Sequence, residues 1–536
     1  MEEFDWVFRG GRVFTGDDRG FIEKDVGVRG KEIAMVGNRT GYRADRSVQL
    51  NGRILSPGFI DLHSHSDLSL LEDGRGLSKL YQGVTTEVTG NCSMSPAPIR
   101  AGIQNVVEDN CSYMAGNVRW NWEHFNQYLN RLDEAGTALN IVPQVGHGTL
   151  RTFVVGVEDR PATSKEIQQM CEIASECFDR GASGLSTGLM YAPSSYASRD
   201  EIKALCQVVS NHNAMYSTHM RNEGHEMLDS IEETLEVTRE TSVRTQISHL
   251  KAAGPPNWGD VCEAVERIER VRSEGYKINF DVYPYLRGST QIRSLLPPFV
   301  TRGSTEKMLE RLRNPQIRDR IKQAMNQGYE GWDSFFGPGA ITPQRVQVGS
   351  LETEKNCTLQ GKTLAEIASQ QEKEPWDVLC DLLIEEKGKG LCVLDLLNEN
   401  DVIELMSVPW SIVASDGLAI APDSHWQNKQ VHPRYYGCFP RFLRQYVLEK
   451  SVLGLEQALH KMTSLPAQQL GTPARGMIRE GTVADLVVFD PDRIDDRATY
   501  DQPHRLSTGV DWLFVQGDCV LENSQFTEAF PGNVGI

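Results

Sequence analysis

Short apolar runs alternate with amphipathic stretches through the middle of the chain. Stretches such as "HEMLDSIEETLEVTRET" and "GDVCEAVERIERVRSEG" place apolar residues at i, i+3 and i+4 opposite charged ones, a pattern typical of surface helices. Between such stretches lie eight apolar runs: "GFIDLHSH", "VTTEVTGNC", "ALNIVPQVGHG", "ASGLSTG", "AMYSTHMR", "RTQISHLK", "KINFDVYPY" and "PWSIVASDG". Eight strands alternating with helices predict an α/β fold, a (β/α)8 TIM-like barrel.

Both ends of the chain have a different pattern. "DWVFRGGRVFTG" and "DVGVRGKEIAMVG" are each typical of two β-rich runs around a turn, and so are "GMIREGTVADLVVFDP" and "DWLFVQGDCVLEN" near the C-terminus. We expect residues 1–56 and 473–536 to form one small β-sandwich domain and residues 57–472 to form the barrel. A charged helical segment, residues 287–344, interrupts the alternation and is predicted to be an insertion after the seventh strand.

The composition narrows the class of protein. With 536 residues, 39% of them hydrophobic and 24% charged, the chain is typical of a globular protein. A formal net charge of -18 argues against non-specific nucleic-acid binding. The eleven cysteines follow no repeating spacing, and no apolar run is long enough to cross a bilayer. We therefore expect a cytoplasmic protein with a small-molecule partner, and the pattern indicates no oligomeric state.

Residues able to bind a metal follow the predicted strands at their C-terminal ends. Two histidines follow the first strand, and one such residue follows each of the second, fifth, sixth and eighth: His63, His65, Cys92, His219, His249 and Asp416. In a parallel barrel these ends open on one face, where catalytic loops gather. Each residue also has an ordinary interpretation, as a hydrogen-bonded histidine, a core cysteine or a turn aspartate. Their shared position is better explained by one metal site.

This set of donors predicts a chemistry. Imidazole nitrogens and a thiolate are ligands that Zn²⁺ prefers, and the set is large enough for up to two ions with open positions. Water on such a zinc ion loses a proton near pH 7. Asp416 would accept that proton and pass it to a leaving nitrogen. The residues therefore predict metal-assisted hydrolysis of an amide.

"PGFIDLHSH" followed much later by "SDG" resembles the amidohydrolase superfamily. Within it, several stretches resemble the N-acyl-D-amino-acid deacylases (D-aminoacylases): "YQGVTTEVTGNCSMSPAP", "GLSTGLMYAPSSYAS", "THMRNEG", "SHLKAAG", "DVYPYLRGST", "HPRYYGCFPRFL", "KMTSLPAQQLG" and "GTVADLVVFDP". Many superfamily members carry a metal-bridging carboxylated lysine on the fourth strand, but "GASGLSTG" has none. The D-aminoacylase branch uses a cysteine after the second strand, where Cys92 lies in "GNCS".

The resemblance implies zinc-dependent hydrolysis of N-acyl-D-amino acids, with Asp416 as general base and acid. It implies one tightly bound zinc ion on Cys92, His219 and His249, and a second, weaker site on His63 and His65 with Cys92 as a bridge. It further implies that three residues bind the α-carboxylate of the substrate: Lys251, Tyr283 and Ser289. Arg293, after "GST", either pairs with an acidic substrate side chain or faces solvent.

Two other functions are compatible with the residues. One is a different amidohydrolase that acts on cyclic amides or dipeptides. The other is a non-catalytic scaffold, which all six candidate donors disfavour because such a protein should have lost some of them. "NCSMSPAP" also departs from the form close to "NCGFS" associated with the family, so the loop after Cys92 and the acyl-group preference are left open.

Overall fold

Eight parallel strands form a barrel in the computed structural model, which describes residues 2–17, 19–116, 118–329, 332 and 341–535. Hydrogen-bonded ladders join the first three strands and the remaining five. The strands are β8 (Phe59–Asp61), β9 (Val84–Thr89), β10 (Asn140–Pro143, continued by β11, Val145–Gly146), β12 (Gly184–Gly188), β13 (Met215–His219), β14 (Arg244–Ile247), β15 (Ile278–Val282) and β19 (Ser411–Val413). Each lies in one of the eight predicted runs, so the TIM-like barrel is confirmed.

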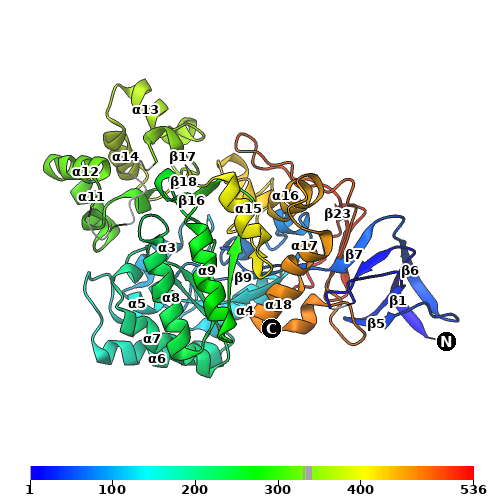
Figure 1. The fold of residues 1–536 in the computed structure, drawn as a ribbon. Coiled ribbons are helices and arrows are strands. Elements are labelled where there is room, and N and C mark those ends of the chain that lie inside the picture. Colours follow the sequence, from blue (N-terminus) through cyan, green and yellow to red (C-terminus); the bar gives the residue numbers. More distant parts are fainter. Residues whose placement is uncertain (1, 18, 117, 330–331, 333–340, 536) are drawn as a thin grey trace.

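Amphipathic helices cover the outside of the barrel (Figure 1). In α7 (Arg199–Asn211) the buried residues Ile202, Leu205, Cys206 and Val209 lie at helical spacing, and Ser198 caps the first turn by accepting from the Glu201 N–H. The other main helices around the barrel are α4 (Phe125–Ala135), α5 (His147–Val154), α6 (Ser164–Asp179), α8 (Met227–Thr241), α9 (Val261–Ser273), α15 (Glu399–Ser407), α16 (Arg434–Arg441), α17 (Leu455–Met462) and α18 (Ser464–Leu470).

Strands from both ends of the chain share one sheet. β20 (Leu486–Phe489) lies between β7 (Ile54–Pro57) and β21 (Val510–Val515), antiparallel to both. β22 (Asp518–Glu522), β23 (Gln525–Phe526), β2 (Arg12–Phe14) and β3 (Phe21–Ile22) extend this sheet. A second sheet contains β1 (Glu3–Arg9), β4 (Val26–Arg29), β5 (Glu32–Val36) and β6 (Arg43–Gln49), and packs against the first through aromatic contacts of Trp6 and Phe8 with Phe514.

The insertion after the seventh barrel strand is longer than predicted and is not only helical. β16 (Arg287–Gln291) pairs with β18 (Leu391–Asp395), which also pairs with β17 (Val346–Val348). Around this sheet lie α10 (Pro298–Thr301), α11 (Thr305–Arg313), α12 (Pro315–Gln327), α13 (Leu364–Gln371) and α14 (Pro375–Glu385). Residues 330–331 and 333–340 of the predicted segment 287–344 lie outside the described residues. The difference arises because the partner of β16 lies roughly a hundred residues away, where no local pattern indicates the pairing.

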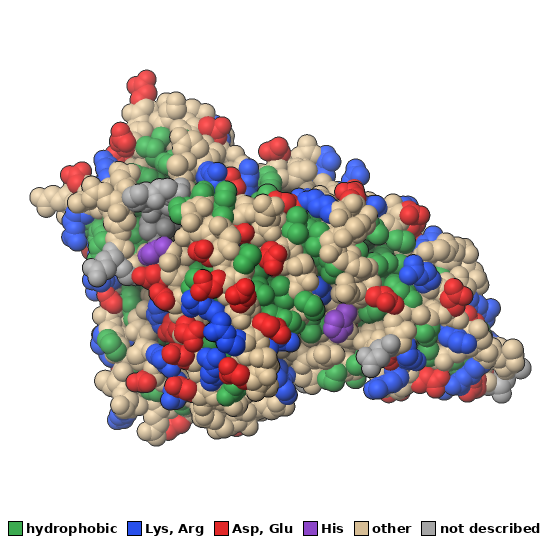
Figure 2. All heavy atoms as spheres, viewed as in Figure 1, with side chains coloured by type: hydrophobic (Ala, Val, Ile, Leu, Met, Phe, Trp, Pro, Cys, Tyr) green, Lys and Arg blue, Asp and Glu red, His purple; other side chains and the backbone are tan. Residues whose placement is uncertain are grey.

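The outer surface mixes charges of both signs. Figure 2 shows acidic and basic side chains interspersed over α7, α8 and α9. Ion pairs cross from helix to helix there, as from Arg199 to Glu240 at 3.0 Å and from Arg239 to Glu274 at 2.9 Å. Within the described part of the chain, no helix has the length and apolar character needed to span a membrane.

Candidate metal centre and its pocket

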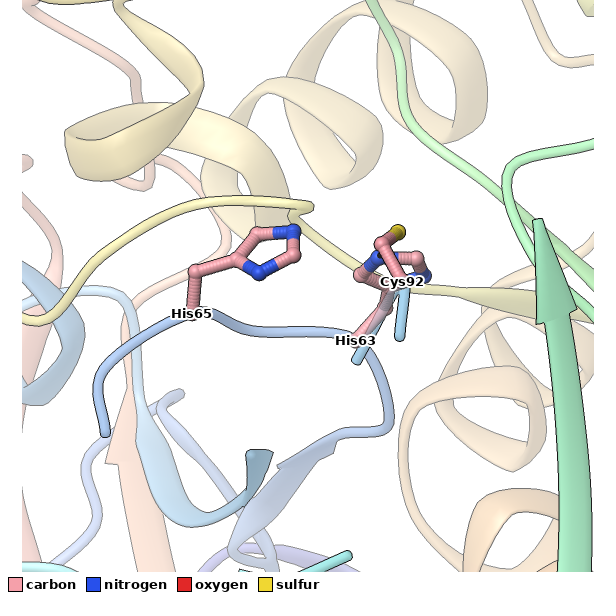
Figure 3. A group of neighbouring side chains, drawn as sticks. All are labelled: His63, His65 and Cys92. Atoms are coloured by element: carbon pink, nitrogen blue, oxygen red, sulfur yellow. Dashed lines mark hydrogen bonds between the residues drawn. The ribbon is translucent and has the colours of Figure 1, made fainter. Parts of the chain in front are cut away.

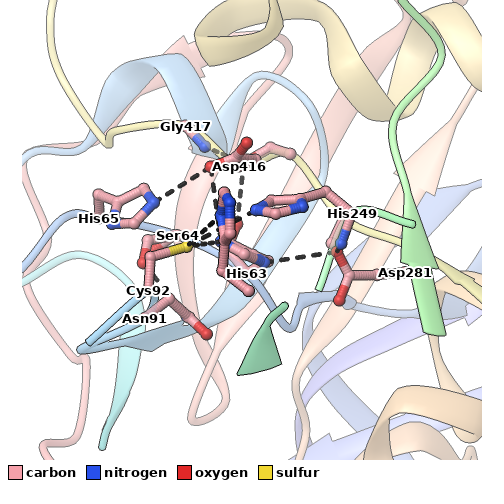
Figure 4. Close-up of polar contacts among 12 residues, drawn as sticks. His63, Ser64, His65, Asn91, Cys92, His249, Asp281, Asp416 and Gly417 are labelled. Carbon is pink, nitrogen blue, oxygen red and sulfur yellow. Dashed lines mark hydrogen bonds and ion pairs between the residues drawn. The ribbon is translucent and has the colours of Figure 1, made fainter. Parts of the chain in front are cut away.

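The six predicted metal-binding residues converge at the C-terminal face of the barrel, and five of them, all except His219, are labelled in Figures 3 and 4. Their donor atoms form three overlapping groups, each with atoms within 4.8 Å of one another: His63 with His65 and Cys92; Cys92 with His219 and His249; and His63 with His249 and Asp416. The first two groups are those predicted for the weaker and the tighter zinc site. All six side chains are buried. The C-terminal ends of five different strands therefore bring together residues up to 353 positions apart in the sequence.

Cys92 lies at the centre of the cluster. Its Sγ is 3.3 Å from His63 Nε2, 3.8 Å from His219 Nδ1 and 3.7 Å from His249 Nε2. Tetrahedral zinc with ordinary bond lengths holds a sulfur and a nitrogen ligand about 3.6 Å apart. The donor set and its spacing fit a zinc ion on Cys92, His219 and His249. Figure 3 shows His65 set apart from His63 and Cys92, so it reaches the cluster from another direction.

Three residues of the cluster have left-handed backbone conformations. The φ angles are 51° at Cys92, 35° at His249 and 50° at Asp416. Such conformations cost roughly 1–2 kcal/mol each for residues other than glycine and persist only where neighbours enforce them. Gly188 leaves room for the Cys92 backbone, since a Cβ there would lie 2.5 Å from the Cys92 carbonyl oxygen. Three of the six candidate metal-binding residues are therefore held in strained backbone conformations.

Asp416 has separate partners for its two oxygens. Oδ1 lies 3.1 Å from His65 Nε2 and 3.4 Å from His63 Nε2 (Figure 4), and Oδ2 lies 3.0 Å from Arg434 Nη2. Burial raises the pKa of this carboxyl, but the positive charges of Arg434 and His63 outweigh it, and the pKa lies well below its usual range. Asp416 is therefore a carboxylate, the form a proton acceptor requires.

A buried ion cluster fixes the floor of the site. Lys79, in α2 (Leu77–Leu80), places Nζ 2.7 Å from Asp61 Oδ2, 2.5 Å from Glu87 Oε1 and 2.8 Å from Ser415 Oγ. Asp61 Oδ1 accepts from the Ser415 N–H at 2.9 Å. Asp61 ends β8 and Ser415 precedes Asp416, so the cluster joins the first and last barrel strands beneath the proposed base.

A pocket opens above the cluster. Lys251, Tyr283 and Ser289 line it, as predicted, together with Arg434 and apolar residues such as Leu396. The structure thus brings the three predicted substrate-binding residues to one pocket, while their roles stay predictions. Lys251 is already paired there, with Nζ 2.6 Å from Glu223 Oε1 and 2.8 Å from His249 Nδ1.

Arg293 does not line this pocket. It is half-buried in the wall of an adjoining pocket, which shares Met94, Tyr191 and Gln291 with the first. Its Nη2 donates to Asn110 Oδ1 at 2.9 Å, and within the described ranges no carboxylate forms an ion pair with it. Arg293 is therefore a cation with neutral hydrogen-bond acceptors, on which the charge of Asp109 also acts, in a pocket that shares part of its wall with the one over the metal donors.

Sequence reasoning missed three residues of the site. Arg434 and Glu223 lie in the family-like stretches "HPRYYG" and "THMRNEG", but nothing in either stretch shows that the side chain faces the metal cluster. Glu223 lies four residues after His219, but the segment between them is a loop, so this spacing does not show which way the side chain points. Tyr113, whose hydroxyl is 3.1 Å from His65 Nδ1, comes from the segment between two barrel strands and has no sequence signal.

Comparison with known proteins agrees with this geometry. The sequence model of the amidohydrolase family matches residues 46–521. A D-aminoacylase of Alcaligenes xylosoxydans xylosoxydans is 32% identical over 99% of this chain and 98% of its own length, and an N-acyl-D-glutamate deacylase of the same organism is 32% identical over 97% and 94%. The N-acyl-D-glutamate deacylase of Bordetella bronchiseptica, solved with zinc and a phosphonate mimic of the tetrahedral intermediate, is 29% identical over 99% of both chains, with a TM-score of 0.83.

These matches extend over nearly the full length of the chain, and they agree with a barrel whose strand ends present a cysteine, four histidines and an aspartate to one cluster. The chain therefore belongs to the amidohydrolase family, in the branch formed by the D-aminoacylases.

Proposed function

We propose that this enzyme hydrolyses the amide bond of N-acyl-D-amino acids, giving a carboxylate and a free D-amino acid, with zinc bound to Cys92, His219 and His249. The observation that carries the proposal is the convergence of this donor set, a buried carboxylate and a cation-lined pocket at one end of the barrel. His63 and His65, with Cys92 shared, are the donors for a second, weaker zinc ion.

Zinc, when bound, acidifies water and polarises the amide carbonyl. Asp416 accepts one proton from the attacking water through Oδ1, the oxygen that faces the metal donors. The water oxygen bonds to the carbonyl carbon, the amide C–N bond breaks, and Asp416 delivers the same proton to the leaving nitrogen, so that a carboxylic acid and an amine are formed. Arg434 holds Oδ2 at 3.0 Å and so keeps the carboxylate in one orientation during both transfers.

The pocket residues are suited to bind the α-carboxylate of the substrate. Lys251 and Arg434 are cations, and Tyr283 and Ser289 offer hydroxyl groups. Arg434 is the better-placed cation, since its buried Nε and Nη1 make no hydrogen bond within the part of the chain that the structure describes. Buried donors without partners are costly, and a carboxylate would satisfy them.

Arg293 supports a preference for acidic D-amino acids. Within the described residues Arg293 is a half-buried cation whose hydrogen-bond acceptors are an amide and a carbonyl, and its pocket adjoins the pocket over the metal donors; this favours a second carboxylate on the substrate. Sequence identity does not decide this point, because the D-aminoacylase and the N-acyl-D-glutamate deacylase are both 32% identical to the chain. We therefore propose N-acyl-D-glutamate and N-acyl-D-aspartate as preferred substrates.

A substrate panel tests the reaction. The zinc-loaded enzyme is incubated with N-acetyl-D- and N-acetyl-L-amino acids, a hydantoin and a dipeptide, and released amine is measured. We expect turnover of the D-isomers alone. Faster turnover of the hydantoin or the dipeptide would assign the chain to another amidohydrolase reaction.

Arg293→Leu tests the side-chain preference. Loss of one buried charge contact should lower kcat/KM for N-acetyl-D-glutamate about 10- to 100-fold, corresponding to roughly 1.5–3 kcal/mol, and leave N-acetyl-D-leucine nearly unchanged. Arg302→Leu is the control, because Arg302 belongs to the same insertion but pairs with Asp159. Equal losses for both substrates would contradict the assignment.

We also infer a cytoplasmic location. All eleven cysteines are free of disulfides, as in proteins of reducing compartments.

A further inference from the structure

Glu223 lies behind the proposed zinc ligands, on the side away from Cys92. Its side chain is 3% exposed. Oε1 lies 2.9 Å from His249 Nδ1, and Oε2 faces His219 Nε2 at 3.6 Å, a charge contact rather than a hydrogen bond. The opposite ring nitrogens, His249 Nε2 and His219 Nδ1, face Cys92 Sγ. One carboxylate therefore faces the outer nitrogen of both imidazoles.

Lys251 competes with zinc for the tautomer of His249. Its Nζ lies 2.8 Å from His249 Nδ1 and 2.6 Å from Glu223 Oε1. An ammonium group only donates, so it can bond Nδ1 only when that nitrogen carries a lone pair. The neutral ring then carries its hydrogen on Nε2, the nitrogen that must bind the metal. Lys251 and zinc therefore require opposite tautomers of the same ring.

We propose that Glu223 is a positioning residue that resolves this competition. Its Oε1 accepts the hydrogen of His249 Nδ1 and also accepts from Lys251, which leaves the lone pair of Nε2 for the metal. Its negative charge likewise favours a hydrogen on His219 Nε2, which faces Glu223, and this leaves the lone pair of His219 Nδ1 for the metal. No proton is gained or lost; the carboxylate selects a tautomer and holds the lysine. The inference deepens the proposed function and rests on its zinc ligands.

The arrangement gives Glu223 two roles. The residue that prepares the tight zinc site also fixes the lysine expected at the substrate α-carboxylate. Partners of metal-binding histidines typically change metal affinity 10- to 100-fold when they are removed. Here the size of the loss should depend on Lys251, because its contact with His249 Nδ1 stabilises the wrong tautomer. A purely structural glutamate would show no such dependence.

The experiment compares zinc dissociation constants of the full-length wild type, Glu223→Gln, Lys251→Met and the double variant, measured by competition with a chromophoric chelator in the absence of substrate. We expect Glu223→Gln to weaken binding about 10- to 100-fold and Lys251→Met to stay within about threefold of wild type. The double variant should bind zinc at least about threefold more tightly than Glu223→Gln, because the competing donor is gone. Wild-type affinity in Glu223→Gln, or a double variant no better than Glu223→Gln, would overturn the proposal.

A second comparison covers the case in which Glu223→Gln fails to fold because Lys251 is left as an unpaired buried charge. Lys251→Met and the double variant lack that charge, and the double variant should still bind zinc about threefold more weakly; equal constants would reject the role of Glu223. Glu233→Gln is the matched control, since Glu233 pairs with Arg221 at 2.9 Å, away from the imidazoles.

The thiolate-to-Co²⁺ absorption band of the cobalt-substituted proteins provides a separate readout of the metal environment. It should keep its intensity in Glu233→Gln and lose intensity in Glu223→Gln at equal metal concentration; an unchanged band in Glu223→Gln would count against the proposal. These measurements use metal and no substrate. They can therefore reject the role of Glu223 without rejecting the proposed reaction, which the substrate panel tests.

Discussion

At the residue scale, the orientation of the Asp416 carboxylate is fixed because its two oxygens have different partners. Arg434 lies against one carboxylate oxygen, and the histidines of the metal cluster lie against the other. A base held in this way needs no reorientation when substrate arrives, which is how positioning lowers an activation barrier. The left-handed φ of 50° at the same residue is part of the arrangement.

Asp416→Asn should lower kcat about 10²- to 10⁴-fold, because the amide cannot accept the proton of the attacking water. Zinc content should stay near that of the wild type, since Cys92, His219 and His249 form a complete donor group without it. Turnover of an N-acetyl-D-amino acid and metal analysis of the same sample check both parts. Retained turnover would remove Asp416 from its role.

The donors of the cluster could be predicted from the sequence, whereas their supporting residues could not. His63, Cys92 and Asp416 each follow a predicted strand, and the barrel places all strand ends on one face. Glu223 and Arg434 act through the direction of a side chain in a loop and at a helix start. That direction depends on tertiary packing, which no local pattern records.

At the scale of elements, the barrel closes through a short stretch of backbone pairing and a buried ion cluster, and not through an extended ladder. No strand pairing joins β19 to β8 in the described chain, apart from one isolated bridge between Ser64 and Gly417. Two backbone hydrogen bonds accompany this bridge, from the Asp416 N–H to the His63 carbonyl at 2.9 Å and from the His65 N–H to the Gly417 carbonyl at 2.8 Å. The cluster of Lys79 with Asp61 and Ser415 adds side-chain contacts. The same backbone hydrogen bonds and buried ion pair therefore close the barrel and place the base.

Lys79→Met should lower the free energy of unfolding by about 3–5 kcal/mol, because it leaves Asp61 and Glu87 as unpaired buried charges. Urea unfolding followed by circular dichroism measures the change. Lys203→Met is the control: its partner Glu240 is 2.9 Å away but the pair is exposed, so the loss should be below about 1 kcal/mol. Equal losses in the two variants would contradict the importance of the buried cluster.

Lys461 attaches α17 to the start of β19 and makes stability depend on pH. Its buried ammonium donates to the carbonyls of Val408 and Ser411, and burial lowers its pKa to about 7. The unfolded chain, with a lysine pKa of about 10.4, binds more protons between about pH 7 and 10. The penalty for burying this charge is therefore complete below pH 7 and fades as the pH rises.

Lys461→Met tests this dependence. The melting temperature of the variant relative to the wild type should be higher at pH 6.5 than at pH 9.5, because the variant lacks the penalty. An identical difference at both pH values would show that Lys461 has the same protonation in the folded and unfolded states.

The sequence predicts the strands of the barrel better than the strands of the insertion. All eight barrel strands could be predicted, because each is a short apolar run between amphipathic helices. The sheet of the insertion could not, because β16 and β18 are weakly patterned and far apart in the chain. Local periodicity reports which face is buried, and it does not report which distant strand is the partner.

At the scale of the whole molecule, zinc should stabilise the fold, because the cluster binds metal only when five strand ends are assembled. Zinc at about 100 times its dissociation constant should add about 2.7 kcal/mol to the free energy of unfolding. Calorimetry of the chelator-treated protein with and without added zinc measures the shift in melting temperature. Cys92→Ser should abolish that shift, since Cys92 belongs to both proposed zinc sites; a normal shift in this variant would contradict the shared donor.

The sheet built from both ends of the chain has a consequence for synthesis. β7 pairs with β20, whose residues emerge from the ribosome roughly 430 positions later, or about 20 to 90 s at ordinary translation rates. During that interval one edge of β7 has no partner and is exposed to other chains. Chaperone capture of the nascent chain is therefore expected to last until β20 is translated, whatever the order in which the barrel itself folds.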